Sequence, residues 1–159
     1  MITARRERGM KDDCFVCKRI KQIQDNSNPY FVTELPSGYV ALGDFQFYPG
    51  YTVFLSKIHA TELHELPKAD RSQFLEDMAI VAEAVFNAFQ PLKLNYELLG
   101  NLDSHMHWHI FPRYADDPNP TNPVSVIPPE IRNAESTRPS SDQLTSMKLK
   151  LHTELAKLI

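Results

Sequence analysis

The sequence predicts an α+β fold in which helices cover an antiparallel sheet of about five strands. Short runs rich in β-branched and aromatic residues recur along the chain, with Pro and Gly turns between them. Two longer stretches repeat apolar residues every three or four positions, which is the period of a helix that buries one face. The chain has 159 residues, enough for one domain with its own hydrophobic core.

The first half of the chain is expected to contain a short helix and three strands. The helix covers residues 18–24 and ends before a turn that contains Pro29. Strands are expected at residues 30–35 and 39–43, where they form a hairpin, and at residues 51–55. The third run is apolar on both sides, which favours a central position in the sheet.

A long helix and two further strands follow. Asp70 is expected to cap the long helix, together with Gln73 in a capping-box spacing, and Pro91 ends it. The apolar stripe of this helix consists of Phe74, Met78, Val81, Val85 and Phe89. Strands are expected at residues 93–99 and 105–111. They complete a sheet of about five strands.

The predicted organisation has four parts. Residues 1–12 form a flexible N-terminal arm, and residues 13–114 form the main domain. Residues 115–139 are rich in proline and are expected to form a long surface loop. A C-terminal helix over residues 140–159 packs on the same domain through a leucine-rich stripe, and Ser140 begins it with a capping box.

Composition excludes several classes of partner. The net charge of −3 gives no basic patch of the kind that binds nucleic acid polymers. No apolar run approaches 18 residues, so no membrane span is expected, and the charged N-terminus is not a secretory signal. Two cysteines do not make a disulfide framework. We therefore expect a cytoplasmic protein.

Three histidines alternate with apolar residues near position 107. In a strand, His105, His107 and His109 lie on one face, and Met106, Trp108 and Ile110 lie on the other. The histidine face then carries three groups that titrate near neutral pH, held on a rigid element. This pattern favours either a metal site formed by all three or a catalytic row.

Histidine chemistry fits phosphoryl transfer. The sequence contains neither of the two glycine-rich phosphate-binding motifs, so the histidines must supply the chemistry. An unprotonated imidazole nitrogen can attack phosphorus and form a covalent intermediate, provided that an acceptor holds the proton on the other nitrogen. A neighbouring histidine can contact a phosphate oxygen or protonate the leaving group.

The run from His105 to Phe111 resembles the His-x-His-x-His-x-x signature of the histidine triad (HIT) nucleotide hydrolases and transferases. The flanking residues 95–101, with Pro112 and Arg113, resemble the diadenosine-polyphosphate-hydrolase-like branch. The resemblance covers residues 14–114. It implies a HIT-like fold and a homodimer.

The resemblance also implies an activity. It points to a nucleotide hydrolase that acts at the α-phosphate of dinucleoside polyphosphates or related nucleotidyl compounds and releases a nucleoside monophosphate. His107 would be the nucleophile, His109 would contact the phosphate or the leaving group, and His105 would complete the triad.

Nucleotide contacts are expected from four residues. Asp44 stands where the family has an acidic residue that accepts from the ribose hydroxyls, and Phe45 lies beside it. Asn101 and Leu102 replace the usual polar pair before the triad, and Asn101 can still donate from its amide. Arg113 could compensate by binding the polyphosphate.

Cys14 and Cys17 allow three interpretations: a zinc site, a redox pair, or two ordinary core thiols. No βαβ unit precedes them, which disfavours a thioredoxin-like redox pair. Residues 57–63 resemble a stretch of zinc-containing HIT relatives, and on that pattern Cys14, Cys17, His59 and His105 hold structural zinc. In the competing interpretation, His105 is a hydrogen-bond partner within the active site.

The sequence also allows other functions. A phosphoramidase, a phosphorylase or a nucleotidylyltransferase would use the same His107 intermediate with a different substrate or acceptor. The altered residues Asn101 and Leu102 leave room for a nucleotide-binding regulatory module with little turnover. A protein that only binds metal would use all three triad histidines on one ion.

Overall fold

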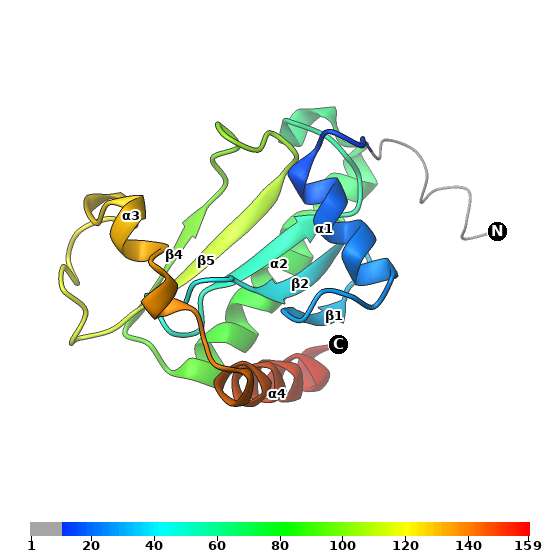
Figure 1. Cartoon of the computed structure of the whole chain (residues 1–159). Helices are drawn as coiled ribbons and strands as arrows, with labels where there is room; N and C mark the ends of the chain where they lie inside the picture. The colour runs from blue at the N-terminus through cyan, green and yellow to red at the C-terminus, as the bar shows by residue number, and fades with distance from the viewer. Residues whose placement is uncertain (1–10) are drawn as a thin grey trace.

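The structure is a computed structural model that describes residues 11–159. Its centre is one five-stranded antiparallel sheet in the order β1-β2-β3-β5-β4 (Figure 1). The strands are β1 Phe31–Glu34, β2 Gly38–Leu42, β3 Thr52–Ser56, β4 Lys93–Glu97 and β5 His107–Arg113. The predicted α+β class and the central position of the third strand are confirmed. Most of the expected N-terminal arm lies outside the described residues.

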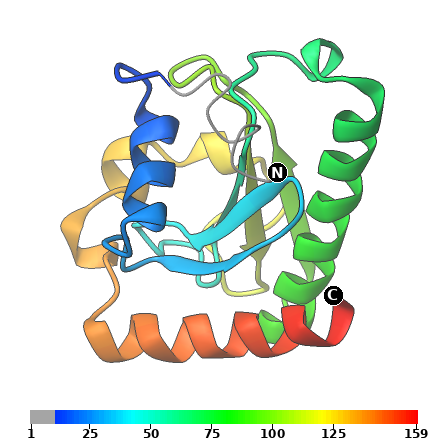
Figure 2. The same cartoon turned by 90° about the vertical axis from the view of Figure 1, so that its right-hand side faces the viewer.

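Helices cover both faces of the sheet. They are α1 Phe15–Gln24, α2 Lys68–Phe89, α3 Pro129–Arg132 and α4 Ser141–Leu158, with single 3-10 turns η2 Leu63–Glu65, η3 Val124–Val126 and η4 Glu135–Thr137. In Figure 2, α1 and α3 lie on one side of the sheet, and α2 lies on the other. Helix α4 packs against α2 and β1.

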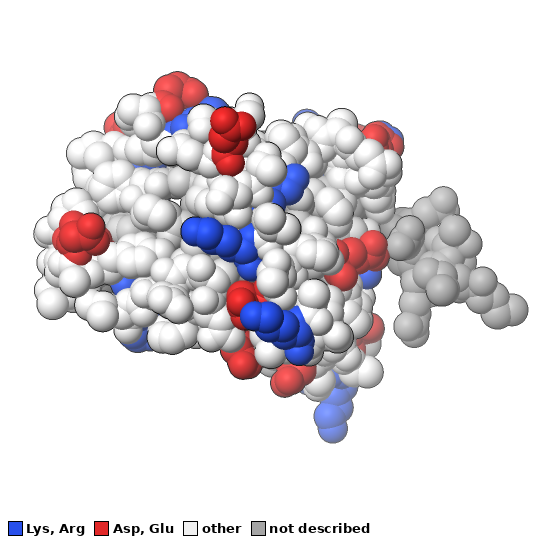
Figure 3. Space-filling view, turned by 90° about the horizontal axis from the view of Figure 1, so that it is seen from below, with Lys and Arg blue, Asp and Glu red and all other residues white. Residues whose placement is uncertain are grey.

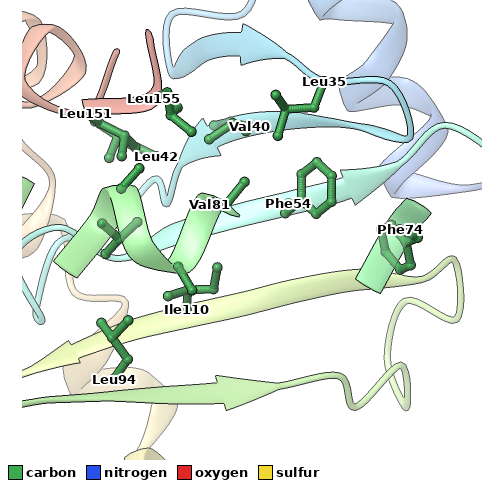
Figure 4. Packing of buried hydrophobic residues seen from close by; sticks show 14 of the residues in the cluster. Leu35, Val40, Leu42, Phe54, Phe74, Val81, Leu94, Ile110, Leu151 and Leu155 are labelled. Carbon is green, nitrogen blue, oxygen red and sulfur yellow. The ribbon is translucent and has the colours of Figure 1, made fainter. Parts of the chain in front are cut away.

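The main core lies between the sheet and helices α2 and α4 (Figure 4). Phe54 and Ile110 of the sheet, Val81 of α2 and Leu155 of α4 are fully buried there. Each such side chain contributes about 1.5–3 kcal/mol to folding by leaving water. The predicted stripes of both long helices are therefore confirmed, and the opposite face of the sheet is left for α1 and the segment around α3.

Helix α1 begins earlier than the predicted residue 18. Cys14 has extended backbone geometry and is the N-cap, because its sulfur accepts a hydrogen bond from the backbone N–H of Cys17 at 3.4 Å. The apolar side of the helix, with Val16 and Ile20, packs on Tyr39 and Leu55 of the sheet. This packing brings both cysteines close to the start of β5.

The start of α2 also differs from the prediction. The helix begins at Lys68, and Pro67 stands at the N-cap, so Asp70 lies within the first turn and the expected capping box is absent. Gln73 instead donates to Asp77 at 2.7 Å. In α4, by contrast, the predicted capping box forms in both directions between Ser140 and Gln143.

The proline-rich segment packs on the domain and makes three short helical turns, η3, α3 and η4. Val124 is buried against Tyr48 and Phe111, on the same side of the sheet as α1. Figure 1 shows this segment beside the strands, at the opposite end from α1. The sheet face between α1 and α3 is thus walled on two sides.

Among residues 11–159, none of the helices combines the length and the apolar character needed to cross a bilayer. The face seen in Figure 3 carries acidic and basic side chains close to one another instead of one uniform sign.

Candidate active site

Strand β5 brings two of the three histidines to the walled face of the sheet. His107 pairs with Leu55 of β3, and His109 pairs with Val53 of β3 and Glu97 of β4. Leu55 and Val53 pack against α1, so their cross-strand partners lie on the same face. The ring centroids of His107 and His109 are 4.6 Å apart.

The proton on His107 has a defined position. Its Nδ1 lies 2.7 Å from the backbone carbonyl oxygen of His105. A carbonyl can only accept a hydrogen bond, so Nδ1 carries a proton, and in the neutral ring Nε2 keeps its lone pair. Within the described chain, Nε2 has no hydrogen-bond partner. This ring has the tautomer that a nucleophilic nitrogen requires.

His109 is held by Tyr51, whose hydroxyl oxygen lies 2.6 Å from Nδ1. Burial, and then the nearby charges of His107 and Arg132, lower the pKa of His109 to about 4. Burial raises the pKa of Tyr51, so its hydroxyl stays protonated and can donate. A Cβ atom at Gly43 would lie 2.1 Å from the Tyr51 ring, so the glycine permits this close packing. His109 is therefore a neutral imidazole at pH 7.

His105 is separated from the other two rings. It is buried, its Nε2 donates to the carbonyl of Ser56 at 2.8 Å, and its Nδ1 faces the sulfurs of Cys14 and Cys17. Only its backbone carbonyl contacts His107. The expectation of a catalytic ring at this position is corrected, because both of its nitrogens point into the interior.

Four side chains form a candidate metal centre: Cys14, Cys17, His59 and His105 offer one donor atom each, all within 4.8 Å of one another. Nδ1 of His105 lies 3.6 and 3.4 Å from the two sulfurs, and Nδ1 of His59 lies 3.3 Å from Cys17. Ordinary Zn–S and Zn–N bonds in a tetrahedron place sulfur and nitrogen about 3.6 Å apart.

The protonation pattern of this cluster also suits a cation. Because Nε2 of His105 donates to Ser56, its Nδ1 lone pair is directed at the sulfurs. Burial lowers the pKa values of His105, to about 4, and of His59, which keeps both rings neutral. Burial also raises the pKa of the Cys17 thiol, a cost that a bound cation would offset. The four residues therefore fit zinc.

Asp44 and Phe45 lie where β2 ends. The Asp44 carboxylate pairs with Arg19 of α1 through Oδ1, and Oδ2 has no partner in the described chain. Phe45 lines the pocket beside His109, with the Arg138 guanidinium 4.4 Å from its ring centroid. Both residues border the histidine face, so a nucleotide there could reach them.

Asn101 and Arg113, the other two expected nucleotide contacts, lie in different surroundings. Asn101 is exposed in the loop between β4 and β5. Arg113 is buried, and its five N–H groups are directed to Asp117, to Asn95 and to backbone carbonyls of the proline-rich segment. The proposed polyphosphate contact of Arg113 is therefore wrong: this side chain anchors the segment and has no donor left.

The structure adds Tyr51 and Arg132 to the site. A pocket of about 210 Å³ lies beside His109, and both residues line it. Its full lining is Phe45, Phe47, Tyr48, Tyr51, Glu97, Leu99, His109, Phe111, Arg132 and Asn133. Sequence periodicity could not reveal these partners, because the pairing of β3 with β5 and the path of the proline-rich segment are long-range features.

A sequence model of the HIT domain matches residues 24–116, more than half of the chain. The chain belongs to the HIT family. No curated protein sequence matches it. Membership of the HIT family supports nucleotide binding and hydrolase or transferase chemistry in general terms.

Solved HIT structures share this fold. A histidine triad protein from Marinobacter aquaeolei is 24% identical, with a TM-score of 0.66, covering 81% of this chain and 90% of its own. One from Bradyrhizobium japonicum is 22% identical, with a TM-score of 0.68 and coverages of 79% and 89%. A zinc-bound histidine triad family protein from Mycobacterium smegmatis is 21% identical, with a TM-score of 0.59 and coverages of 92% and 95%.

Proposed function

We propose that this HIT protein hydrolyses dinucleoside polyphosphates or related nucleotidyl compounds at the α-phosphate, through a nucleotidyl intermediate on His107. The observation that supports this most directly is the 2.7 Å contact between Nδ1 of His107 and the His105 carbonyl. It leaves Nε2 unprotonated on the walled face of the sheet. An enzyme that attacks phosphorus through imidazole needs this arrangement before substrate binds.

The reaction would proceed in two displacements. Nε2 of His107 attacks the α-phosphorus, and the P–O bond to the leaving phosphate breaks with its electron pair. The intermediate has a P–N bond, and the proton stays on Nδ1, where its hydrogen bond to the His105 carbonyl stabilises the cationic ring. Water then attacks phosphorus, the P–N bond breaks, Nε2 regains its lone pair, and the water proton passes to solvent. The products are a nucleoside monophosphate and the departed phosphate compound.

Neighbouring groups have supporting roles. The neutral His109 can donate from Nε2 to a phosphate oxygen when the Tyr51 hydroxyl donates to its Nδ1. Asp44 can accept from the ribose hydroxyls through its free oxygen. Zinc, when bound by Cys14, Cys17, His59 and His105, supplies structural cross-linking. It holds the residue whose carbonyl orients His107.

A panel of adenylylated compounds tests the proposal, with AMP release as the measurement. The wild-type protein should release AMP from diadenosine tetraphosphate or from adenosine phosphoramidate. His107→Ala should lose at least about 1,000-fold in kcat while remaining folded. His64→Ala, which removes a histidine of the short turn η2, is the matched control and should keep full activity.

Three results would change the assignment. Full activity of His107→Ala would overturn the nucleophile and with it the proposed reaction. Release of ADP in place of AMP, only when inorganic phosphate is added, would identify a phosphorylase. Tight AMP binding without turnover of any compound would instead favour a regulatory module.

A further inference from the structure

One wall of the histidine face comes from outside the matched HIT domain. The match ends at residue 116, whereas the pocket beside His109 is closed by residues of the proline-rich segment. Arg132, the last residue of α3, is half-buried in this wall. Its charge acts on His109, Tyr51 and Tyr48, three of the aromatic residues that line the pocket with it.

The guanidinium of Arg132 is bound to the protein through Nε, and its two terminal nitrogens are available. Its Nε donates to the backbone carbonyl of Ile127 at 2.8 Å, which orients the side chain. Among residues 11–159, neither terminal nitrogen has a hydrogen-bond partner, and no carboxylate lies within ion-pair distance. A half-buried guanidinium with two open nitrogens has the geometry that binds a phosphate through two hydrogen bonds.

Each of the other arginines around this face pairs with a carboxylate of the protein. Arg19 pairs with Asp44, and Arg138 makes a two-point pair with Glu135. Arg113 uses all five of its donors within the protein. Of these four arginines, Arg132 is the one that pairs with no carboxylate of residues 11–159.

A cation near the leaving group would assist the proposed reaction. As the P–O bond breaks, negative charge accumulates on the departing phosphate, and a fixed positive charge lowers the barrier. His109 cannot supply that charge at pH 7, because burial keeps it neutral. Glu97 also lines the pocket, and its carboxylate would repel a phosphate, so a phosphate should bind on the side of Arg132.

We propose that Arg132 binds a phosphate of the substrate's leaving group, and that the segment around α3 thereby selects substrates with a polyphosphate chain. This inference rests on the proposed function and assigns a substrate class to it. The buried Tyr48 hydroxyl beside it has no protein partner in the described structure, which is consistent with a polar ligand in the pocket.

Kinetics on two substrates test this role. Diadenosine tetraphosphate has leaving-group phosphates, whereas adenosine phosphoramidate has only the phosphorus that is attacked. Arg132→Gln should lower kcat/KM about 10- to 100-fold on the first, as expected for losing charge-assisted hydrogen bonds, and less than about 3-fold on the second. Arg132→Lys should recover part of the loss. Arg71→Gln on α2, across the sheet, is the charge-matched control.

A binding measurement separates this inference from the proposed reaction. Calorimetry should show that Arg132→Gln weakens binding of inorganic tripolyphosphate about 10-fold or more, with AMP binding little changed. If the wild type hydrolyses nothing, the proposed reaction fails, and this measurement still decides the role of Arg132. Equal losses on both substrates, no loss on either, or unchanged tripolyphosphate binding would overturn the inference.

Discussion

Reactivity at single residues depends on which ring nitrogens carry protons. The His105 carbonyl sets the tautomer of His107, and the Tyr51 hydroxyl does the same for His109. Each imidazole thus has one nitrogen occupied by the protein and one available to a substrate. The site is pre-organised before a nucleotide arrives, which lowers the reorganisation that the reaction requires.

Tyr51→Phe should lower both activity and stability. His109 would lose its 2.6 Å partner, so its ring would be free to rotate and either nitrogen could carry the proton. We expect kcat to fall about 10-fold or more and the free energy of unfolding to fall by about 1–2 kcal/mol. Tyr114→Phe, which removes a hydroxyl contact to the Pro49 carbonyl, is the control and should preserve kcat. An unchanged kcat in Tyr51→Phe would exclude a positioning role.

Two elements outside the sheet are attached to it by polar clusters in addition to their apolar contacts. Helix α1 is linked to the start of β5 through the cysteine and histidine cluster. The proline-rich segment is linked to the end of β5 through Arg113 and Asp117, whose side chains are 3% and 5% exposed. Both attachments border the histidine face, so each supports a wall of the site.

The buried pair that anchors the proline-rich segment should show strong coupling. Arg113→Met would leave the Asp117 carboxylate buried without its partner, which costs about 3–5 kcal/mol. Adding Asp117→Leu removes that unpaired charge, so the double variant should be less destabilised than the sum of the single variants. Urea unfolding of the four proteins measures the coupling. Additive single effects would show that the pair does not anchor the segment.

Metal removal should loosen helix α1. We expect about one zinc ion per chain by elemental analysis, and a lower melting temperature after chelation, because binding energy at such a site contributes to folding. Cys17→Ser should bind less zinc and should respond little to the chelator. A wild-type protein that takes up no zinc when it is supplied would contradict the metal assignment.

At the scale of the whole molecule, buried neutral histidines link stability to pH. Folding lowers the pKa of His109 from 6.5 to about 4, so between these values the unfolded chain binds more protons than the folded one. Stability is then complete above pH 6.5 and is lost progressively as the pH falls towards 4. The shift corresponds to at most about 3 kcal/mol.

This pH dependence can be assigned by comparing two proteins. The free energy of unfolding of metal-free wild-type protein, measured in urea at pH 7.5 and at pH 4.5, should fall more than that of His109→Gln. Histidines that do not interact with His109 contribute equally to both proteins, so the difference reports His109 together with its interaction with His107. An equal fall in the free energy of unfolding of the two proteins would indicate that His109 is already exposed to water in the folded state.

Local sequence patterns were sufficient to predict most of the elements. The alternation around His107 identified a strand, the leucine-rich stripe identified α4, and Ser140 marked its start. These are properties of a few consecutive residues, set by backbone periodicity and by side chains that cap the nearest N–H groups. The cap of α2 was misplaced because Gln73 bonds Asp77, one turn along the helix, in place of the helix start.

The partners of the site residues were decided by tertiary structure alone. Arg113 is an anchor and not a phosphate ligand because the proline-rich segment folds back over it. Arg132 reaches the pocket for the same reason, and Tyr51 meets His109 through the register of β3 against β5. The sequence by itself determined which side chains could do the chemistry. Only the packing of distant segments decided which of them face the substrate, because burial and pairing depend on neighbours far away along the chain.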